Sequence, residues 1–382
     1  MDKLLKFFAY KPIAAIFAAI VIAAFGWNYS RNLPVDVFPD IPVPRVVIQT
    51  EAPGLTAEEV EERITIPIEA VMNGIPGIST IRSSSSGGLS FVWVEFDWQV
   101  DLNRARFDVF ERLQRIRASL PEGADAEIAP LVSVTGEIML VALTSAKTNG
   151  ASPLELREIA EYELRPRLLS ERGVGEVVVL GGRLPEYRIS VAPRKLAQYN
   201  LSIDDVIDAV RDTRTYASAG YLASVKGDEI PLRQVARADT LESIKRSPVI
   251  VDGTGALRLD DVADVSLSGT PRRGSASFNG REAVIVSIQK SPGGNTPEIT
   301  ARLDKVVEDF RVFAQTKGIV LHTNAYRQAD FINVSVSGAA RVVRDAAAVV
   351  LIVLVLTLFR VRTILVVLLS MALPLPVSLA LF

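Results

Sequence analysis

The sequence contains no cysteine and only one histidine, His322, among its 382 residues. Without cysteine the chain has no disulfides, no thiolate nucleophiles and no thiolate metal ligands. A hydrolase that needs an imidazole base could use only His322, and no catalytic serine motif accompanies it, so we expect no enzymatic activity. A lone histidine late in a β-like run is typical of a packed or surface side chain.

No charge of one sign dominates either, because 42 Lys and Arg residues face 44 Asp and Glu residues, for a formal net charge of −2. The sequence therefore offers no basic field for nucleic acid. The segment "GGLSFVWVEF" also lacks the basic first residue of an RNA-binding strand. Its aromatic residues and the next tryptophan are predicted to pack against helices or a neighbouring subunit: Phe91, Trp93, Phe96 and Trp98.

Nucleotide-binding motifs are absent or incomplete. "GVGEVV" precedes a strand, where a dinucleotide turn should follow one, and "SPGGNT" lacks the Lys-Ser/Thr pair that binds phosphates. Energy for any transport would therefore come from an ion gradient or a partner. No carboxylate lies at the centre of an apolar run, so we predict no proton relay within this chain, and no cofactor.

Long apolar runs, in contrast, are present at both ends. "PIAAIFAAIVIAAFGW" carries no charge and, with its flanks, approaches the ~20 residues that cross a bilayer. Lys3, Lys6 and Lys11 precede it, which places the N-terminus in the cytoplasm. A cleaved signal peptide is the alternative, but the run is long for one and "GWNYSRN" is a poor cleavage site.

Two further apolar runs follow near the C-terminus, "AAAVVLIVLVLTLF" and "TILVVLLSMALPLPVSLALF". Arg360 and Arg362 lie in the short link between them, which indicates a tight cytoplasmic turn. Asp345, at the outer start of the second run, is predicted to form an interfacial ion pair with Arg341 or Arg344. Because the chain ends inside an apolar run, we interpret it as a fragment.

After the first apolar run comes a stretch with five prolines, "LPVDVFPDIPVPRVVIQTEAPG", and we call the part before the strand "RVVIQTE" the arm. Proline fixes φ and removes an amide donor, so the arm is predicted to be stiff and extended until the strand "RVVIQTE". We interpret it as a riser from the first span to the first strand, with little conformational freedom.

The region between the spans alternates between strand and helix periodicity. After the first strand, Thr56 and Glu59 form a capping box, followed by apolar residues at helical spacing. A hairpin around "SSSSGG", a second helix after Asp101 and the strand "AEIAPLVSV" complete the pattern. This order, β-α-β-β-α-β, predicts a ferredoxin-like unit.

A second copy of the same pattern follows. "GEIMLVALT" is its first strand, and "SPLE" starts a helix with an N-cap serine and a proline at the first helical position. "GEVVVLGG", "AVIVSIQK", the helix start "NTPE" and "GIVLHTNA" continue the copy. Residues 181–275 interrupt it between the second and third strands, and we predict that they form a separate small domain.

Two such units, the second interrupted and both placed between two spans, resemble the N-terminal portion of a resistance-nodulation-division (RND) efflux pump inner-membrane permease. The resemblance spans the whole chain. It is carried by "LPVDVFPDI", "TEAPGLTAEEVEERITIPIEAVMNGIPGISTIRSSSSGGLS", "RLLSERGVGEVVVLGG", "YRISVAPRKLAQYNLSIDDVIDAV" and "FRVRTILVVLLSMALPLPVSL".

The resemblance implies an α/β membrane protein with periplasmic porter subdomains and an inserted α+β docking domain. It also implies a bacterial inner-membrane homotrimer driven by proton antiport, with a periplasmic adaptor protein and an outer-membrane channel as partners. The expected parts are a first transmembrane helix (1–30), a first porter subdomain (31–134), a second porter subdomain (135–180 and 276–330), the docking domain (181–275), a second transmembrane helix (331–360) and a truncated third one (361–382).

Within the family, "GVGEVVVLGG", "KLAQYNLSIDDVIDAV" and the compact insertion are more similar to the heavy-metal efflux branch than to the drug-efflux branch. Glu137, in "TGEIML", resembles an acidic position of the metal branch near the substrate cleft, which implies a metal ligand. A solvated strand-edge carboxylate is the alternative for Glu137. For the whole chain, the alternatives are a permease for amphipathic drugs and a membrane-anchored periplasmic interaction module without transport.

Overall fold

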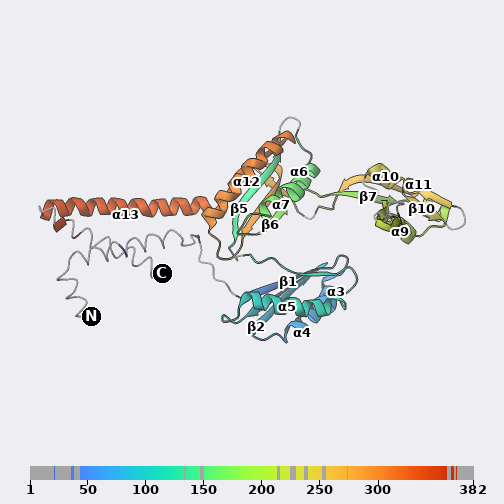
Figure 1. Cartoon of the computed structure of the whole chain (residues 1–382), viewed down its shortest axis with the longest axis horizontal. Helices are drawn as coiled ribbons and strands as arrows, with labels where there is room; N and C mark the ends of the chain where they lie inside the picture. Colours follow the sequence, from blue (N-terminus) through green and yellow to red (C-terminus); the bar gives the residue numbers. More distant parts are fainter. Residues whose placement is uncertain are drawn as a thin grey trace.

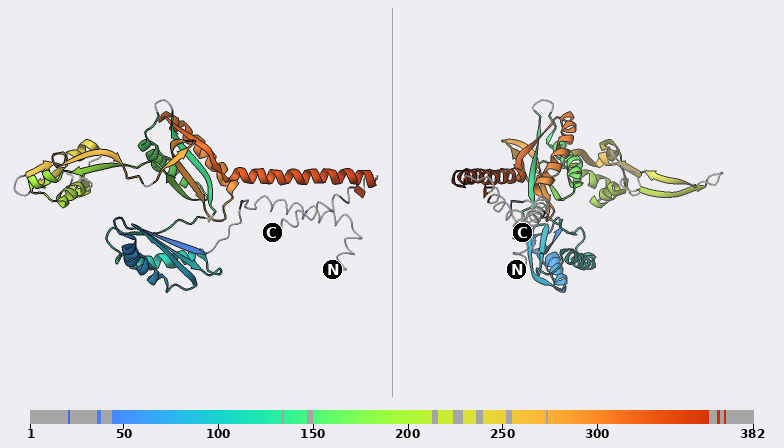
Figure 2. Two further views of the ribbon diagram at one scale, coloured as in Figure 1. Left: turned by 180° about the vertical axis from the view of Figure 1, so that it is seen from behind. Right: turned by 60° about the vertical axis from the view of Figure 1, so that its left-hand side comes forward.

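The computed structural model describes residues 21, 36–37, 44–132, 135–146, 150–212, 216–223, 229–235, 240–251, 255–272, 274–358, 363–364 and 367. Two α/β units, an elongated insertion and a long helix make up this part of the chain (Figure 1). Seen from two further directions, the insertion and the long helix extend away from the second unit on opposite sides (Figure 2). The predicted spans at 1–30 and 361–382 lie almost wholly outside the described residues.

The first unit is a four-stranded antiparallel sheet with the order β2-β3-β1-β4, which is the predicted β-α-β-β-α-β topology. Alternate residues of the two central strands, such as Val46 and Val94, are fully buried beneath the helices. Its elements are β1(Arg45–Glu51), α3(Ala57–Val60), η1(Glu61–Thr65), α4(Ile66–Met72), β2(Ile78–Ser86), β3(Leu89–Phe96), α5(Leu102–Arg117) and β4(Asp125–Ile128).

The first helix begins at the predicted capping box. The backbone N–H of Thr56 donates to Glu59 Oε2 at 2.8 Å, and the N–H of Glu59 donates to Thr56 Oγ1 at 3.3 Å. These bonds satisfy two amides that the first helical turn leaves without partners. They also hold the pKa of the Glu59 carboxyl below its ordinary value.

The second unit repeats the topology, with β6 and β15 as the outer neighbours of the central strands β14 and β5. Its helices and the inward side chains of its sheet enclose a core around Leu143, Leu303 and Phe310. The elements are β5(Glu137–Ser145), α6(Pro153–Ile159), η2(Ala160–Leu164), α7(Arg165–Leu169), β6(Val174–Leu180), β13(Ala276–Phe278), β14(Arg281–Lys290), α12(Thr296–Thr316) and β15(Ile319–Arg327).

Both units share an irregularity in the first helix. In each, a five-residue π-helical stretch, η1 or η2, is followed two residues later by a proline, Pro67 or Pro166. Proline has no N–H to donate to the carbonyl four residues earlier, so the ladder is already broken at that point. A widened turn just before the proline accommodates the break. The same defect at the same place supports the prediction that the two units are copies.

The insertion lies between β6 and β13 and encloses a small core of its own around Val249, Leu259 and Val262. Its two ends form an antiparallel ribbon in which Pro185 lies opposite Gly269. The elements are β7(Pro185–Val191), α8(Pro193–Tyr199), α9(Ile203–Asp212), β8(Tyr216–Ala223), β9(Glu229–Val235), α10(Leu241–Lys245), β10(Pro248–Val251), β11(Gly255–Arg258), α11(Leu259–Val262) and β12(Ala263–Gly269).

After the second unit the chain continues as α13(Gln328–Leu358), a helix of 31 residues. Within the described ranges, no helix is both long and apolar enough to cross a membrane. The span expected at 331–360 ends outside the described residues and stays a prediction. Arg341, Arg344 and Asp345 interrupt the apolar character of α13 there.

Candidate functional site

The sheet of the second unit has one face against its helices and one face that carries polar side chains. Along β14 the side chains of Val286 and Ile288 belong to the core. Ser287 and Gln289 alternate with them and therefore point to the opposite face. We call this second surface the open face. It is the surface on which Glu137, the residue predicted to bind metal, is found.

Glu137 is the first residue of β5 and lies opposite Gln289 of β14. Its Oε2 accepts a 2.6 Å hydrogen bond from the hydroxyl of Ser287. The Glu137 residue is exposed while Ser287 is buried, so a fixed donor orients an accessible carboxylate. Glu137 is thus an exposed carboxylate at the start of a strand with one fixed hydrogen-bond donor, and its role as a metal ligand stays a prediction.

A second carboxylate shares the row. Gln289 lies opposite Glu137 on one side and opposite Glu176 of β6 on the other. Directly opposed residues share a face, so the row presents two carboxylates and one amide. With strands about 4.8 Å apart, a cation above Gln289 would lie within reach of both carboxylates. Sequence reasoning did not find Glu176, although a lone acidic residue in the strand "VGEVVVL" was the available signal.

Tyr326, near the end of β15, borders the same region. Burial raises the pKa of its phenol, and the negative charges of Glu137 and Asp36 raise this pKa further. Tyr326 therefore keeps its proton and can act as a hydrogen-bond donor next to the open face. Opposite Leu140, it lies on the strand that neighbours β5.

The donors on the open face are oxygens: two carboxylates, an amide and hydroxyls. Such ligands suit divalent cations that accept oxygen, and they suit soft monovalent copper or silver poorly. In the described ranges, no group of three or more His, Cys, Asp or Glu side chains converges to hold a metal ion.

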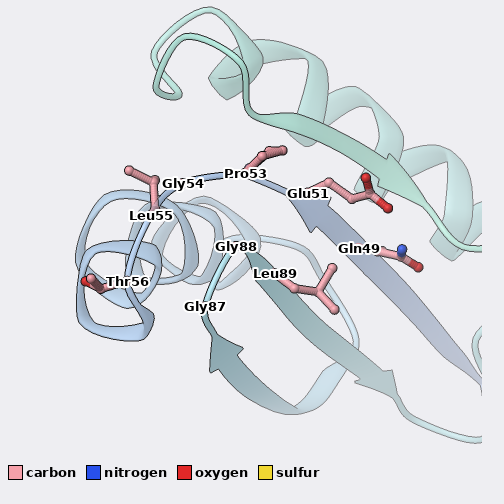
Figure 3. A pocket seen from close by; sticks show the side chains of 9 residues that line it. All are labelled: Gln49, Glu51, Pro53, Gly54, Leu55, Thr56, Gly87, Gly88 and Leu89. Atoms are coloured by element: carbon pink, nitrogen blue, oxygen red, sulfur yellow. The ribbon is translucent and has the colours of Figure 1, made fainter. Parts of the chain in front are cut away.

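The first unit has a hollow of about 420 Å³ at the end of its sheet (Figure 3). Gln49 and Glu51, two residues apart on β1, present their polar groups on one side of the strand. The turn between β2 and β3 closes the other side with Gly87 and Gly88. One carboxylate among backbone and apolar groups is a weaker cation site than the row on the second unit.

The aromatic residues of "GGLSFVWVEFDW" have different positions. Phe96 belongs to the core, as predicted, whereas Trp98 is 68% exposed. Phe91 and Trp93 stack with ring centroids 5.8 Å apart and are half-buried on the sheet face opposite the core. Strand alternation directs them away from the helices of this chain, so of the two predicted contacts only packing against a neighbouring subunit stays a prediction.

The lone histidine is packed, which is one of the two positions predicted for it. Its ring stacks on Phe278 with centroids 4.5 Å apart, and Nε2 lies 2.9 Å from the hydroxyl of Thr144. Asp345 forms the predicted ion pair, at 2.9 Å from Arg344, and both side chains are exposed.

Comparisons with known proteins bear on the chain as a whole. A sequence profile described as the AcrB/AcrD/AcrF family matches residues 4–382. Protein HelA of Legionella pneumophila is 30% identical over 354 residues, which is 92% of this chain and 33% of HelA. The cobalt-zinc-cadmium resistance protein CzcA of Cupriavidus metallidurans is 30% identical over 349 residues, 89% of this chain and 32% of CzcA.

A solved structure supports the same relationship. The crystal structure of a heavy metal efflux pump, crystal form II, matches 98% of this chain and 37% of that chain, with a TM-score of 0.85 and 26% sequence identity. The chain spans about a third of the length of the curated relatives that it matches.

Proposed function

Since the chain belongs to the AcrB/AcrD/AcrF family of RND permeases, we propose that it is the N-terminal part of an exporter of divalent metal cations. The observation that carries this proposal is the row Glu137–Gln289–Glu176 on the open face of the second unit. The Ser287 hydroxyl holds the first carboxylate of that row in place.

The row serves to bind the cargo on its way out. Two carboxylates about two strand spacings apart attract a divalent cation and share its coordination with water. Binding by few protein ligands is weak enough to permit release, which an exporter needs as much as capture. The chain supplies binding and positioning, with no enzymatic reaction of its own and no resident cofactor.

The remaining parts of the proposal concern the whole protein. The full-length permease is a homotrimer in the bacterial inner membrane, with both α/β units as porter subdomains in the periplasm. Residues 181–275 form the docking domain that meets an outer-membrane channel, and a periplasmic adaptor joins the complex. Proton antiport supplies the energy, with the proton-relay carboxylates located beyond Phe382.

A second candidate is export of amphipathic compounds. The stacked pair Phe91 and Trp93, half-buried on the first sheet, favours it, because aromatic faces bind flat apolar molecules. The donor set on the second sheet favours metal. An anchored interaction module without transport is the third alternative, and it predicts no export of either kind.

One experiment separates the three. The gene for the full-length protein is deleted, and growth is measured with zinc, cobalt, cadmium and nickel salts, and with dyes, detergents and antibiotics. We expect lower tolerance to at least one divalent metal and restoration by the unsubstituted gene. Sensitivity to dyes alone would support the drug permease, and unchanged tolerance to all compounds would support the module.

A further inference from the structure

A buried ion pair fastens the proline-rich arm to the second unit. The ammonium group of Lys290, at the end of β14, contacts the carboxylate of Asp36 in the arm. The Lys290 side chain is 1% exposed and the Asp36 side chain 12% exposed. Lys290 also donates a 3.1 Å hydrogen bond to the carbonyl oxygen of Gly294.

Thr296 extends this contact to the start of α13. Its hydroxyl lies 3.3 Å from Asp36 Oδ1 and 3.4 Å from Oε1 of Gln328, the first residue of α13. Thr296 and Gln328 are both buried. Three segments therefore meet at one polar cluster: the arm, the loop from β14 into α12, and the root of α13.

The connection differs from what the order of the sequence suggests. The arm continues directly into β1, so its natural mechanical partner would be the first unit. Asp36 instead contacts Lys290 and Thr296, both of which belong to the second unit. Asp36 is thus joined to the second unit by its contacts, although β1 of the first unit is the next strand in the sequence.

Opening this cluster is costly. Separating the two groups would take the Asp36 carboxylate away from an ammonium group that is almost fully buried, and losing a charge partner in such a place is unfavourable. Thr296 is the first residue of α12, a helix of 21 residues that packs against the core of the second unit. The cluster is therefore attached to a helix that is part of the packed core of the second unit.

We propose that Asp36, Lys290, Thr296 and Gln328 form a tie that makes the arm and the root of α13 move as one body with the second unit. The first unit then moves relative to all three. The transport part of this inference rests on the proposed function. Under that function, motion of the arm and of α13 is transmitted to the unit that carries the row Glu137–Gln289–Glu176.

Distance measurements between spin labels test the tie without relying on transport. The full-length protein is used, with any cysteines outside this chain replaced, because this chain contributes none. One label pair joins Val37→Cys to Asp309→Cys on α12, and a second pair joins Val37→Cys to Ser84→Cys on β2. All three positions are exposed.

We expect a narrow distance distribution for the first pair that is the same with and without zinc and a proton gradient. The second pair should show a broader or shifting distribution. Asp36→Asn and Lys290→Met should each broaden the distance distribution of the first label pair. The double substitution Asp36→Lys with Lys290→Asp, which exchanges the two charges, should make that distribution narrow again. Glu298→Gln, which removes only an exposed ion pair with Arg302 on the same helix, is the matched control and should change nothing.

Two outcomes overturn the tie. The first is that the distance distributions of the two label pairs are equally broad in the labelled protein with Asp36 and Lys290 unchanged. This comparison does not depend on the folding of a charge variant. The second is that the distance distribution of the Val37–Asp309 label pair stays narrow in both Asp36→Asn and Lys290→Met.

Transport is measured separately, as zinc export from cells. We expect Asp36→Asn to lower export at least tenfold and Glu298→Gln to leave it unchanged. Export by Asp36→Asn within twofold of the unsubstituted protein would overturn the coupling role. If the unsubstituted protein exports no metal, the proposed function fails, while the label distances still decide whether the tie exists.

Discussion

The hydroxyl of Ser287 donates a 2.6 Å hydrogen bond to the carboxylate of Glu137, 150 positions away in the sequence. The bond joins the two central strands of the second unit across the open face. It orients a carboxylate that would otherwise rotate freely at the start of a strand. Under the proposed function, a carboxylate that is already held loses less conformational entropy when it binds the cation, and Ser287 becomes part of the site.

Substitutions at this pair should separate metal binding from folding. Glu137→Gln keeps the size of the side chain and removes its charge, so the affinity for zinc should fall strongly. Ser287→Ala removes only the orienting bond and should lower the affinity about tenfold. Isothermal titration of the full-length protein with zinc measures both effects.

The matched control is Glu95→Gln, on the first sheet, with the same change of charge at a half-buried position. We expect zinc affinity within twofold of the unsubstituted protein for this control. Equal losses for Glu95→Gln and Glu137→Gln would show that only net charge matters and would contradict a site on the second sheet.

The sequence indicated one residue of this candidate site, Glu137, but not the residues that lie next to it. The matches to the family and to its heavy-metal members confirm the resemblance of the chain, whereas Glu137 as a metal ligand stays a prediction. Ser287 and Glu176 were missed because strand register decides which residues meet. Register depends on bulges such as the one between Ile288 and Gln289, which leave no clear mark in the sequence.

Local rules worked where the chemistry is local. The capping boxes at Thr56 and Ser152 are present, because side chain and backbone lie three residues apart. The contact between Asp36 and Lys290 spans 254 positions and follows no periodicity, so no local rule could predict it. The π-helical turns also escaped prediction, although Pro67 and Pro166 marked the places where the helices are irregular.

Two buried threonines of the first unit should respond in opposite ways to the same substitution. The hydroxyl of Thr65 lies 2.8 Å from the hydroxyls of Ser85 and Ser90 and donates at 3.3 Å to the carbonyl of Val60. Thr65→Val would leave these groups without the hydrogen bonds that Thr65 makes, which should lower the free energy of unfolding by about 1–3 kcal/mol.

Thr50→Val is its matched control. Thr50 is fully buried, and among the described residues its Oγ1 has no hydrogen-bond partner. Replacing that hydroxyl with a methyl group should leave the free energy of unfolding unchanged or raise it. Urea unfolding of the first unit, residues 31–134, gives both values. Equal destabilisation by the two substitutions would contradict the hydroxyl cluster.

His322 should make the second unit sensitive to mild acid. Burial, and then the charges of Arg311 and Arg281, lower the pKa of its imidazole below the ordinary value of 6.5. Between the lowered pKa and 6.5 the unfolded chain binds more protons than the folded one, so stability falls as the pH falls through this window. Above the window, the neutral ring retains its full contribution.

The measurement compares urea unfolding at about pH 7.5 and about pH 5. His322→Gln should lose less stability between these pH values than the unsubstituted protein. The carboxyls of Glu59 and Glu155, whose pKa values are lowered from 4.5, titrate below this range and contribute little. Because His322 is the only histidine of the chain, its imidazole can be followed by NMR. A pKa at or above 6.5 would contradict the prediction.

Excision of the insertion should leave the second unit folded. The two ends of the insertion meet where it leaves the sheet: Leu184 and Thr270 exchange backbone and side-chain hydrogen bonds at 2.8 and 3.2 Å. Gly181, with φ +79°, lies so close to Ala276 that an added Cβ would be 2.7 Å from the Ala276 Cβ. Joining the ends therefore requires no rearrangement of β6 or β14.

The variant replaces residues 186–268 with Asn-Gly, which favours the tight turn that two antiparallel strands need. We expect the His322 imidazole to keep its lowered pKa, because Phe278, Thr144 and the charged residues around it all lie outside the insertion. Under the proposed function, zinc binding should also persist, whereas capture of an outer-membrane channel should be lost. Loss of the shifted His322 imidazole signal on excision would mean that the insertion is part of the fold of the second unit and not a separate domain.

Gly181→Ala is a companion substitution at the same junction. It should destabilise the second unit, because both the positive φ of Gly181 and its contact with Ala276 exclude a side chain.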